Sequence, residues 1–153
     1  MPIPYHECMV AAEAAYHLPV RALPAIQRVE GGKVGTVSPN KDGSHDLGLM
    51  QVNTRWVTPL ARSTGLPPQT VVTRLIFNPC FNIAAAASIL RTYVDEEHGD
   101  MWRAIGDYHS HTPWLSTPYK LKVMQEAMKL PHGAAVQKPV RRKHRKPEDL
   151  ASD

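Results

Sequence analysis

The segment that most constrains the fold is the apolar stripe between Asn78 and Gly99. Its apolar residues recur at three- and four-residue intervals, as on one face of an α-helix (Ile83, Ala86, Ala87, Leu90 and Val94). Asn78 is placed to cap the helix, Pro79 suits its first position, and Gly99 ends it. The alanines fit either a close approach of a second helix or simple helix propensity. The segment predicts a long helix in a mainly α fold.

Helical spacing recurs over most of the remaining chain. We expect further helices over residues 4–16, 20–30, 49–60, 68–77, 100–108 and 116–130. In the last of these helices, the residues expected to face inward are Leu121, Met124 and Met128. Residues 33–46 have the composition of turns, and a small hairpin fits within residues 33–47. No other segment has a convincing strand pattern.

Composition and charge divide the chain into a domain over residues 1–130 and a basic tail over residues 131–153. A hydrophobic content of 42% supports a packed core, and no apolar run is long enough to cross a bilayer. The domain carries 12 Lys or Arg against 11 Asp or Glu, whereas the tail carries 6 against 3. A near-neutral domain argues against specific nucleic-acid recognition. We expect a disordered, passive tail; contact with a partner, anionic lipid or nucleic acid is the alternative.

Glu30 is the strongest candidate for a catalytic group. It continues the apolar stripe of the helix expected over residues 20–30, where burial disfavours a charged carboxyl. It also lies in the last turn, where the negative end of the helix dipole opposes a carboxylate. Both effects raise the pKa of the carboxyl, as a general acid near neutral pH requires. The alternative is a solvated glutamate at a frayed helix end.

The two cysteines, Cys8 and Cys80, lie far apart in the sequence, each near the start of an expected helix. They could close one long loop as a disulfide or be two unrelated buried thiols, and composition does not choose between these. A disulfide would place the protein in an oxidising compartment. The N-terminal MPIPYHEC has no basic segment followed by an apolar one, so no signal peptide is visible and the export route stays open.

Four sequence blocks occur in the order of a known family: AIQRVEGG, NKDGSHDLGLMQVN, NPCFNIAAAASIL and AIGDYHSHTP, over about 110 residues. The chain resembles the small specialised lytic transglycosylases (SLT, lysozyme-like proteins) that accompany bacterial secretion, conjugation and pilus machineries. VEGG followed by the second block also resembles C-type lysozymes. The resemblance implies a small lysozyme-like domain, mainly α and α+β-derived, in which Cys8 pairs with Cys80.

The resemblance also implies roles for individual residues. Glu30 would be the sole essential acid and base, and Tyr108 would approach its carboxyl across a cleft. The residues implied in binding N-acetylated sugars are Ser44, Gly48, Met50, Gln51, Asn53, Tyr108 and His109. The chain departs from many soluble lytic transglycosylases at Gly31, where they have serine, and at His109, where they have asparagine. These departures remove two of the usual polar contacts.

Asp46 has two interpretations. It aligns with the second catalytic carboxylate of C-type lysozymes, and a retaining hydrolase would need it about 5–5.5 Å from Glu30. Alternatively, it stiffens its loop by accepting hydrogen bonds from backbone N–H groups. We favour the structural role, because the family that the chain resembles more completely does without a second catalytic carboxylate.

Histidine and tryptophan supply weaker candidates. His109 and His111 form an H-x-H pair, but no C-x-x-C or H-E-x-x-H motif accompanies them, so we expect no metal site. His109 is expected to line the cleft instead. Trp56, Trp102 and Trp114 fit either stacking on sugar rings or filling of the core.

The predicted reaction is cleavage of the MurNAc-β-1,4-GlcNAc bond of peptidoglycan with formation of 1,6-anhydromuramic ends. Such cleavage would open the cell wall locally for a secretion or conjugation apparatus. The alternatives are a hydrolytic muramidase that uses Glu30 and Asp46, and a non-catalytic peptidoglycan-binding assembly module. We expect a periplasmic monomer that acts on glycan strands, requires no cofactor, and has components of the apparatus as further partners.

Overall fold

The structure, a computed structural model, describes residues 2–131 and is mainly α with one small sheet, as predicted. The helices are α1 His6–Ala15, α2 Ala22–Glu30, α3 Val57–Thr64, α4 Pro68–Phe77, α5 Pro79–Glu96, α6 Met101–His109 and α7 Pro113–Lys129, with a 3-10 turn η1 over Thr54–Trp56. The strands are β1 Val37–Pro39, β2 His45–Leu47 and β3 Val52–Asn53. The tail predicted over residues 131–153 lies, apart from its first residue, outside the described residues.

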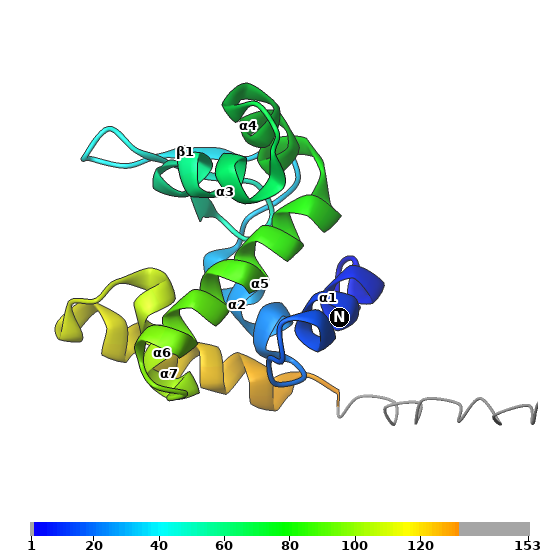
Figure 1. Ribbon diagram of the computed structural model, residues 1–153. Helices are drawn as coiled ribbons and strands as arrows, with labels where there is room; N and C mark the ends of the chain where they lie inside the picture. Colours follow the sequence, from blue (N-terminus) through cyan, green and yellow to red (C-terminus); the bar gives the residue numbers. More distant parts are fainter. Residues whose placement is uncertain (1, 132–153) are drawn as a thin grey trace, which may run out of the picture.

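Helix α5 runs through the middle of the molecule (Figure 1). The sheet, α3 and α4 lie near the first half of α5, and α6 and α7 lie near its last half. Its predicted start is confirmed: the Asn78 side chain accepts a hydrogen bond from the backbone N–H of Phe81 at 3.0 Å, and Pro79 is the first helical residue. Ala86 and Ala87 are fully buried where α5 packs against its neighbours, so the alanines serve close helix packing.

The predicted hairpin is present, and a third strand extends it. β1 pairs antiparallel with β2, and β2 pairs antiparallel with β3, so that Asp46 lies opposite Ser38 on one side and Asn53 on the other. The helix predicted over residues 49–60 is wrong in its first half, because α3 begins only at Val57. Gln51 has a left-handed backbone (φ 53°), and Asn53 is extended while its side chain accepts from the backbone N–H of Arg55.

The predicted inward face of the last helix is wrong. Leu121, Met124 and Met128 are 50%, 46% and 74% exposed, whereas Tyr119 and Val123 of the same helix α7 are buried. Both sets of residues recur at helical spacing, so periodicity alone could not decide which stripe packs inward. Packing of α7 against α2 and α6 buries the stripe that contains Tyr119 and Val123, and it directs Tyr119 toward the end of α2.

Cys8 and Cys80 form a disulfide, as the family resemblance implied. It joins α1 to the first turn of α5, with Cα atoms 5.4 Å apart and the two residues 72 positions apart in sequence. In the part of the chain that the structure describes, no single helix is long and apolar enough to cross a membrane. The pair α4 and α5, bent by 108° at their junction, passes that test of length and composition when taken together.

Candidate active site

Glu30 is the last residue of α2, and two glycines fix the turn that follows it. Gly31 ends the helix in the left-handed conformation (φ 68°) that glycine adopts without strain. Gly32 lies so close to the backbone carbonyl oxygens of Gly48 and Leu49 that a Cβ atom there would collide with them. The chain can therefore pass directly beside the turn between β2 and β3, which brings the end of α2 next to the sheet.

The Glu30 carboxyl has a pKa raised to about 7. Burial is the main cause, because the surrounding protein disfavours the charged form. The negative charge of Asp46 raises the pKa further. The Tyr119 hydroxyl acts in the opposite direction: it donates a hydrogen bond to Glu30 Oε1 at 2.9 Å and so favours the ionised form. The carboxyl can therefore both give and take a proton near neutral pH.

The hydrogen bond to Glu30 comes from Tyr119, whereas Tyr108 is the residue that the family resemblance implied would approach the carboxyl. Tyr108 Oη donates instead to the backbone carbonyl of Met50 at 2.9 Å, which ties α6 to the turn before β3. Tyr108 remains near Glu30, whose charge contributes to raising the pKa of the Tyr108 phenol after the larger effect of burial. Nothing in the spacing of the last helix marked Tyr119, so sequence reasoning missed it.

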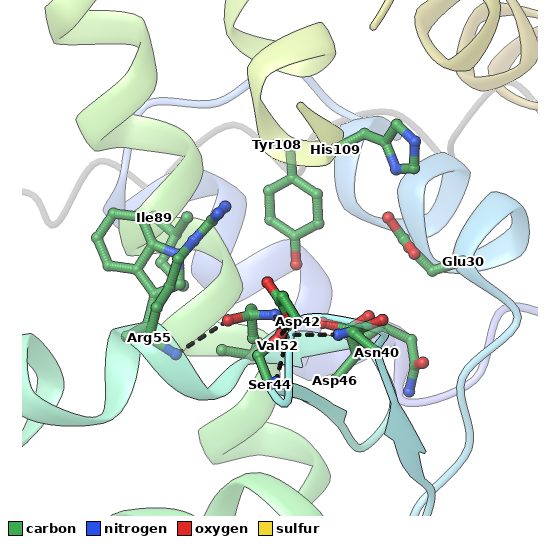
Figure 2. A pocket seen from close by; sticks show the side chains of 13 residues that line it. Glu30, Asn40, Asp42, Ser44, Asp46, Val52, Arg55, Ile89, Tyr108 and His109 are labelled. Carbon is green, nitrogen blue, oxygen red and sulfur yellow. Dashed lines mark hydrogen bonds between the residues drawn. The ribbon is translucent and has the colours of Figure 1, made fainter. Parts of the chain in front are cut away.

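A cavity of about 250 Å³ lies beside Glu30, between the sheet and α5–α6 (Figure 2). Figure 2 shows Glu30 and His109 on one side of the Tyr108 ring and Arg55 on the other. The residues that line the cavity are Glu30, Asn40, Asp42, Ser44, Asp46, Gln51, Val52, Asn53, Arg55, Trp56, Ile89, Tyr108 and His109. The fold thus brings together both candidate acids and five of the predicted sugar-binding residues. Asn40, Asp42, Val52, Arg55 and Ile89 were not predicted.

Gly48 and Met50, by contrast, are not part of the cavity lining. A Cβ atom at Gly48 would collide with the backbone carbonyl of Leu75, and the Met50 side chain is fully buried. The buried Asn82 side chain holds this turn: Oδ1 accepts from the Met50 N–H at 2.8 Å, and Nδ2 donates to the carbonyls of Leu47 and Leu75. These residues shape the cavity from behind, and Asn82 was missed because it stands in an apolar stripe.

The loop-stiffening role predicted for Asp46 belongs to Asp42. Asp42 Oδ1 accepts from the backbone N–H of Ser44 at 2.9 Å, the pattern of an Asx turn. Asp46 lies in β2, and its Oδ1 accepts from Asn53 Nδ2 at 3.0 Å. The same Asn53 amide also donates to Ser44 Oγ. Asp46 is therefore a charged group of the cavity, held by a neighbouring side chain.

The two residues of the H-x-H pair lie in different surroundings. The His109 ring stacks on Tyr119, with centroids 4.7 Å apart and an interplanar angle of 8°, and burial lowers its pKa. His111 Nε2 instead lies 3.8 Å from Glu96 and 3.9 Å from Asp107. Within residues 2–131, no group of three His, Cys, Asp or Glu side chains is placed to hold a metal ion.

The three tryptophans have three different environments. Trp56 lines the cavity and meets the edge of Tyr93. Trp102 lies under the Lys120 ammonium, whose nitrogen is 5.2 Å from the ring centroid. Trp114 is 77% exposed. Of the three, Trp56 and Trp114 are accessible to a ligand near Glu30.

Comparisons with known proteins agree with this geometry. The family described as transglycosylase SLT domain matches residues 7–118. The Salmonella typhimurium protein named invasion protein IagB is 33% identical over 107 residues, which cover 69% of this chain and 63% of that protein, less than two thirds of its length. Protein IpgF of Shigella flexneri is 29% identical over 121 residues, covering 78% of this chain and 76% of IpgF. The family match includes Glu30 and ends one residue before Tyr119.

Proposed function

The chain belongs to the transglycosylase SLT domain family, and from this premise we propose that it is a lytic transglycosylase of peptidoglycan. The bond cleaved is the β-1,4 link from N-acetylmuramic acid to N-acetylglucosamine, and the product carries a 1,6-anhydromuramic end. The observation that carries the proposal is the Glu30 carboxyl. Its pKa of about 7 lets one group act first as an acid and then as a base at the same pH.

In the first step, protonated Glu30 donates its proton to the glycosidic oxygen as the bond to the muramic C1 breaks. The N-acetylglucosamine hydroxyl leaves, and positive charge develops at C1. The 2-acetamido group of the muramic residue supports that charge, so no protein nucleophile is required. Burial of the Glu30 carboxyl favours the protonated form that this step consumes.

In the second step, ionised Glu30 accepts the proton of the muramic C6 hydroxyl while the C6 oxygen bonds to C1. The carboxyl is restored to its protonated form, and no water is consumed. The Tyr119 hydroxyl, which donates to Glu30 Oε1, stabilises the carboxylate between the two proton transfers. One carboxyl therefore suffices where a glycoside hydrolase needs two.

The polar residues of the cavity suit the amide and hydroxyl groups of amino sugars. Ser44, Gln51 and Asn53 supply hydroxyl and amide groups from β3 and the segments that precede β2 and β3, and Trp56 supplies a flat apolar surface. Gln51 Nε2 donates to the Gly48 carbonyl, which fixes the orientation of its side chain. We infer that these residues orient the glycan so that its scissile oxygen meets Glu30.

The direct test is the substitution Glu30→Gln, assayed by release of soluble fragments from purified sacculi. Glutamine keeps the size of the side chain and cannot transfer the proton, so we expect a loss of roughly 10²- to 10⁴-fold. Glu7→Gln, at an exposed glutamate in the first turn of α1, is the matched control and should retain full activity. Equal activity of Glu30→Gln and the wild type would refute the assignment.

A second candidate is a hydrolytic muramidase in which Asp46 is the nucleophile or stabilises the charge at C1. It is favoured by the presence of Asp46 in the same cavity as Glu30 and by the effect of its charge on the Glu30 carboxyl. Mass spectrometry separates the two reactions, because anhydro ends are one water lighter than the reducing ends that hydrolysis leaves. A non-catalytic module, the third candidate, would bind sacculi and release nothing.

The cellular role that we propose is local opening of the cell wall for a secretion or conjugation apparatus, in the periplasm. The support is the family membership together with a relative named as an invasion protein in Salmonella. The disulfide between Cys8 and Cys80 suits an oxidising compartment. Fractionation of cells that produce the protein, followed by thiol trapping of the two cysteines, would test the periplasmic location.

A further inference from the structure

A second cavity, of about 340 Å³, lies on the other side of Glu30, between the end of α2 and the first half of α7. Glu30 and His109 line both cavities, so the two are parts of one groove that continues past the candidate catalytic carboxyl. The first cavity was assigned above to the sugars of the glycan. The second contains no residue that the proposed reaction uses apart from Glu30 and its partner Tyr119.

The chemistry of the two cavities differs. Two aspartates, Asp42 and Asp46, and one cation, Arg55, line the first together with Glu30. Glu30 is the only acid that lines the second, which also holds the cation Lys122. The positive charge of Lys122 acts on His109, which lines both cavities. After the larger effect of burial, it contributes to lowering the pKa of His109. Within residues 2–131, Lys122 forms no ion pair with an acidic side chain.

The second cavity also has an apolar side that faces solvent. Trp114 and Leu115, in the first turn of α7, are 77% and 48% exposed, and both line the cavity. Large apolar side chains at such exposure, rimmed by a cation, are typical of a surface that a ligand covers. The second cavity therefore offers apolar contact and one positive charge, whereas the first offers mainly hydrogen bonds and has more acidic than basic side chains in its lining.

Peptidoglycan presents matching chemistry at one place. Its muramic residues carry a lactyl group and a short peptide stem, which combine small apolar groups with free carboxylates. In the alternating glycan, a muramic residue always lies within one sugar of the cleaved bond. We propose that the second cavity binds the peptide stem, with Lys122 pairing with a stem carboxylate and Trp114 and Leu115 covering its apolar part. This inference rests on the function proposed above and adds to it a recognition site for the peptide.

The test compares binding to intact sacculi with binding to denuded glycan, from which an amidase has removed the stems by hydrolysis, leaving a lactyl carboxylate on each muramic residue but no stem carboxylate. All variants are made in a Glu30→Gln background so that the substrate is not consumed. We expect Lys122→Gln to weaken binding to sacculi by roughly two- to five-fold, the strength of a partly exposed ion pair, and to leave binding to denuded glycan unchanged. The difference should shrink as salt is raised.

Two further variants sharpen the test. Lys120→Gln removes the same charge two residues away on α7, from a side chain that lines neither cavity, and should change neither affinity. Trp114→Ala should also weaken binding to sacculi more than binding to denuded glycan, because it removes exposed apolar contact area. Thermal unfolding of each variant checks that the fold is intact.

The outcomes separate this inference from the proposed reaction. Equal binding of Lys122→Gln and its parent to sacculi, or an equal loss on both substrates, would overturn the inference. If the protein with Glu30 intact released no fragments but still bound stems through Lys122, the reaction would be refuted and the binding site would stand. If fragments were released and Lys122 had no effect, the reaction would stand without the peptide site.

Discussion

Tyr119 Oη donates a hydrogen bond to Glu30 Oε1 at 2.9 Å, although the two residues are 89 positions apart in the sequence. The bond joins the last turn of α2 to the first half of α7; Glu30 lines both cavities, and Tyr119 lines the second. The buried Tyr119 hydroxyl favours the ionised carboxyl, and burial favours the neutral one. A carboxyl balanced in this way can serve as both acid and base.

The first prediction follows from that bond. Tyr119→Phe removes the donor and keeps the ring that stacks on His109, so the pKa of Glu30 should rise above its present value of about 7. The alkaline limb of the pH profile of kcat/KM, which reports loss of the protonated acid, should move to higher pH. We expect activity at neutral pH to fall by about ten-fold, the equivalent of one hydrogen bond to a charged group. An unchanged profile would contradict the role given to Tyr119.

A second prediction concerns stability against pH. The folded-state pKa of Glu30, about 7, lies above the ordinary value of 4.5, so between these values the folded state binds more protons than the unfolded state. The free energy of unfolding of the wild type should therefore fall as pH rises through this window. Glu30→Gln lacks this loss and should be more stable than the wild type above pH 7, by at most about 3 kcal/mol.

Urea unfolding at a series of pH values measures this difference. The stability gap between the wild type and Glu30→Gln should open between about pH 4.5 and 7 and stay constant above that range. A gap that is independent of pH would show that the Glu30 carboxyl titrates normally in the folded protein. In that case Glu30 could not serve as both acid and base near neutral pH.

The substitution Asp46→Asn distinguishes the two reaction types by the size of the loss of activity that it causes. The charge of Asp46 raises the pKa of Glu30, so its removal should lower that pKa and move the alkaline limb of activity to lower pH. For a lytic transglycosylase, we expect activity on sacculi to fall by less than about ten-fold, because no step uses Asp46 directly. A loss as large as that of Glu30→Gln would favour the muramidase mechanism instead.

Asn82→Ala should be the most destabilising single change behind the active site. It deletes a fully buried side chain that makes three hydrogen bonds, to the Met50 N–H and to the carbonyls of Leu47 and Leu75. We expect a loss of about 3 kcal/mol or more, because the backbone groups left behind remain buried. Asn78→Ala, which removes only an exposed helix cap on the same α5, should cost about 1 kcal/mol. Similar losses for the two variants would contradict this account.

The disulfide gives a last prediction. It closes a loop between residues 72 positions apart, so the double variant Cys8→Ala and Cys80→Ala should lose about 4 kcal/mol of stability by the chain-entropy estimate. The bond lies between α1 and the start of α5, and neither cysteine lines a cavity near Glu30. Activity per folded molecule should therefore be retained, and denaturant unfolding combined with a sacculus assay at low temperature checks both points.

The sequence by itself determined the features that depend on neighbours along the chain. The cap of α5 by Asn78, the end of α2 at Glu30 and the antiparallel hairpin of β1 and β2 were all predicted correctly. Each depends on hydrogen bonds or backbone preferences that span only a few residues. Glu30 could be singled out for the same reason, since its place on the apolar stripe and at the helix end is a local property.

Only the tertiary structure decided which distant groups meet. α7 carries two apolar stripes, and packing against α2 and α6 buried the one with Tyr119 and exposed the one with Leu121. The same packing brought Tyr119 to Glu30 as a hydrogen-bond donor, and Asn82 fixed the turn behind the cavity from another helix. Helical spacing states which residues share a face, but which face is buried depends on the fit between elements far apart in the chain.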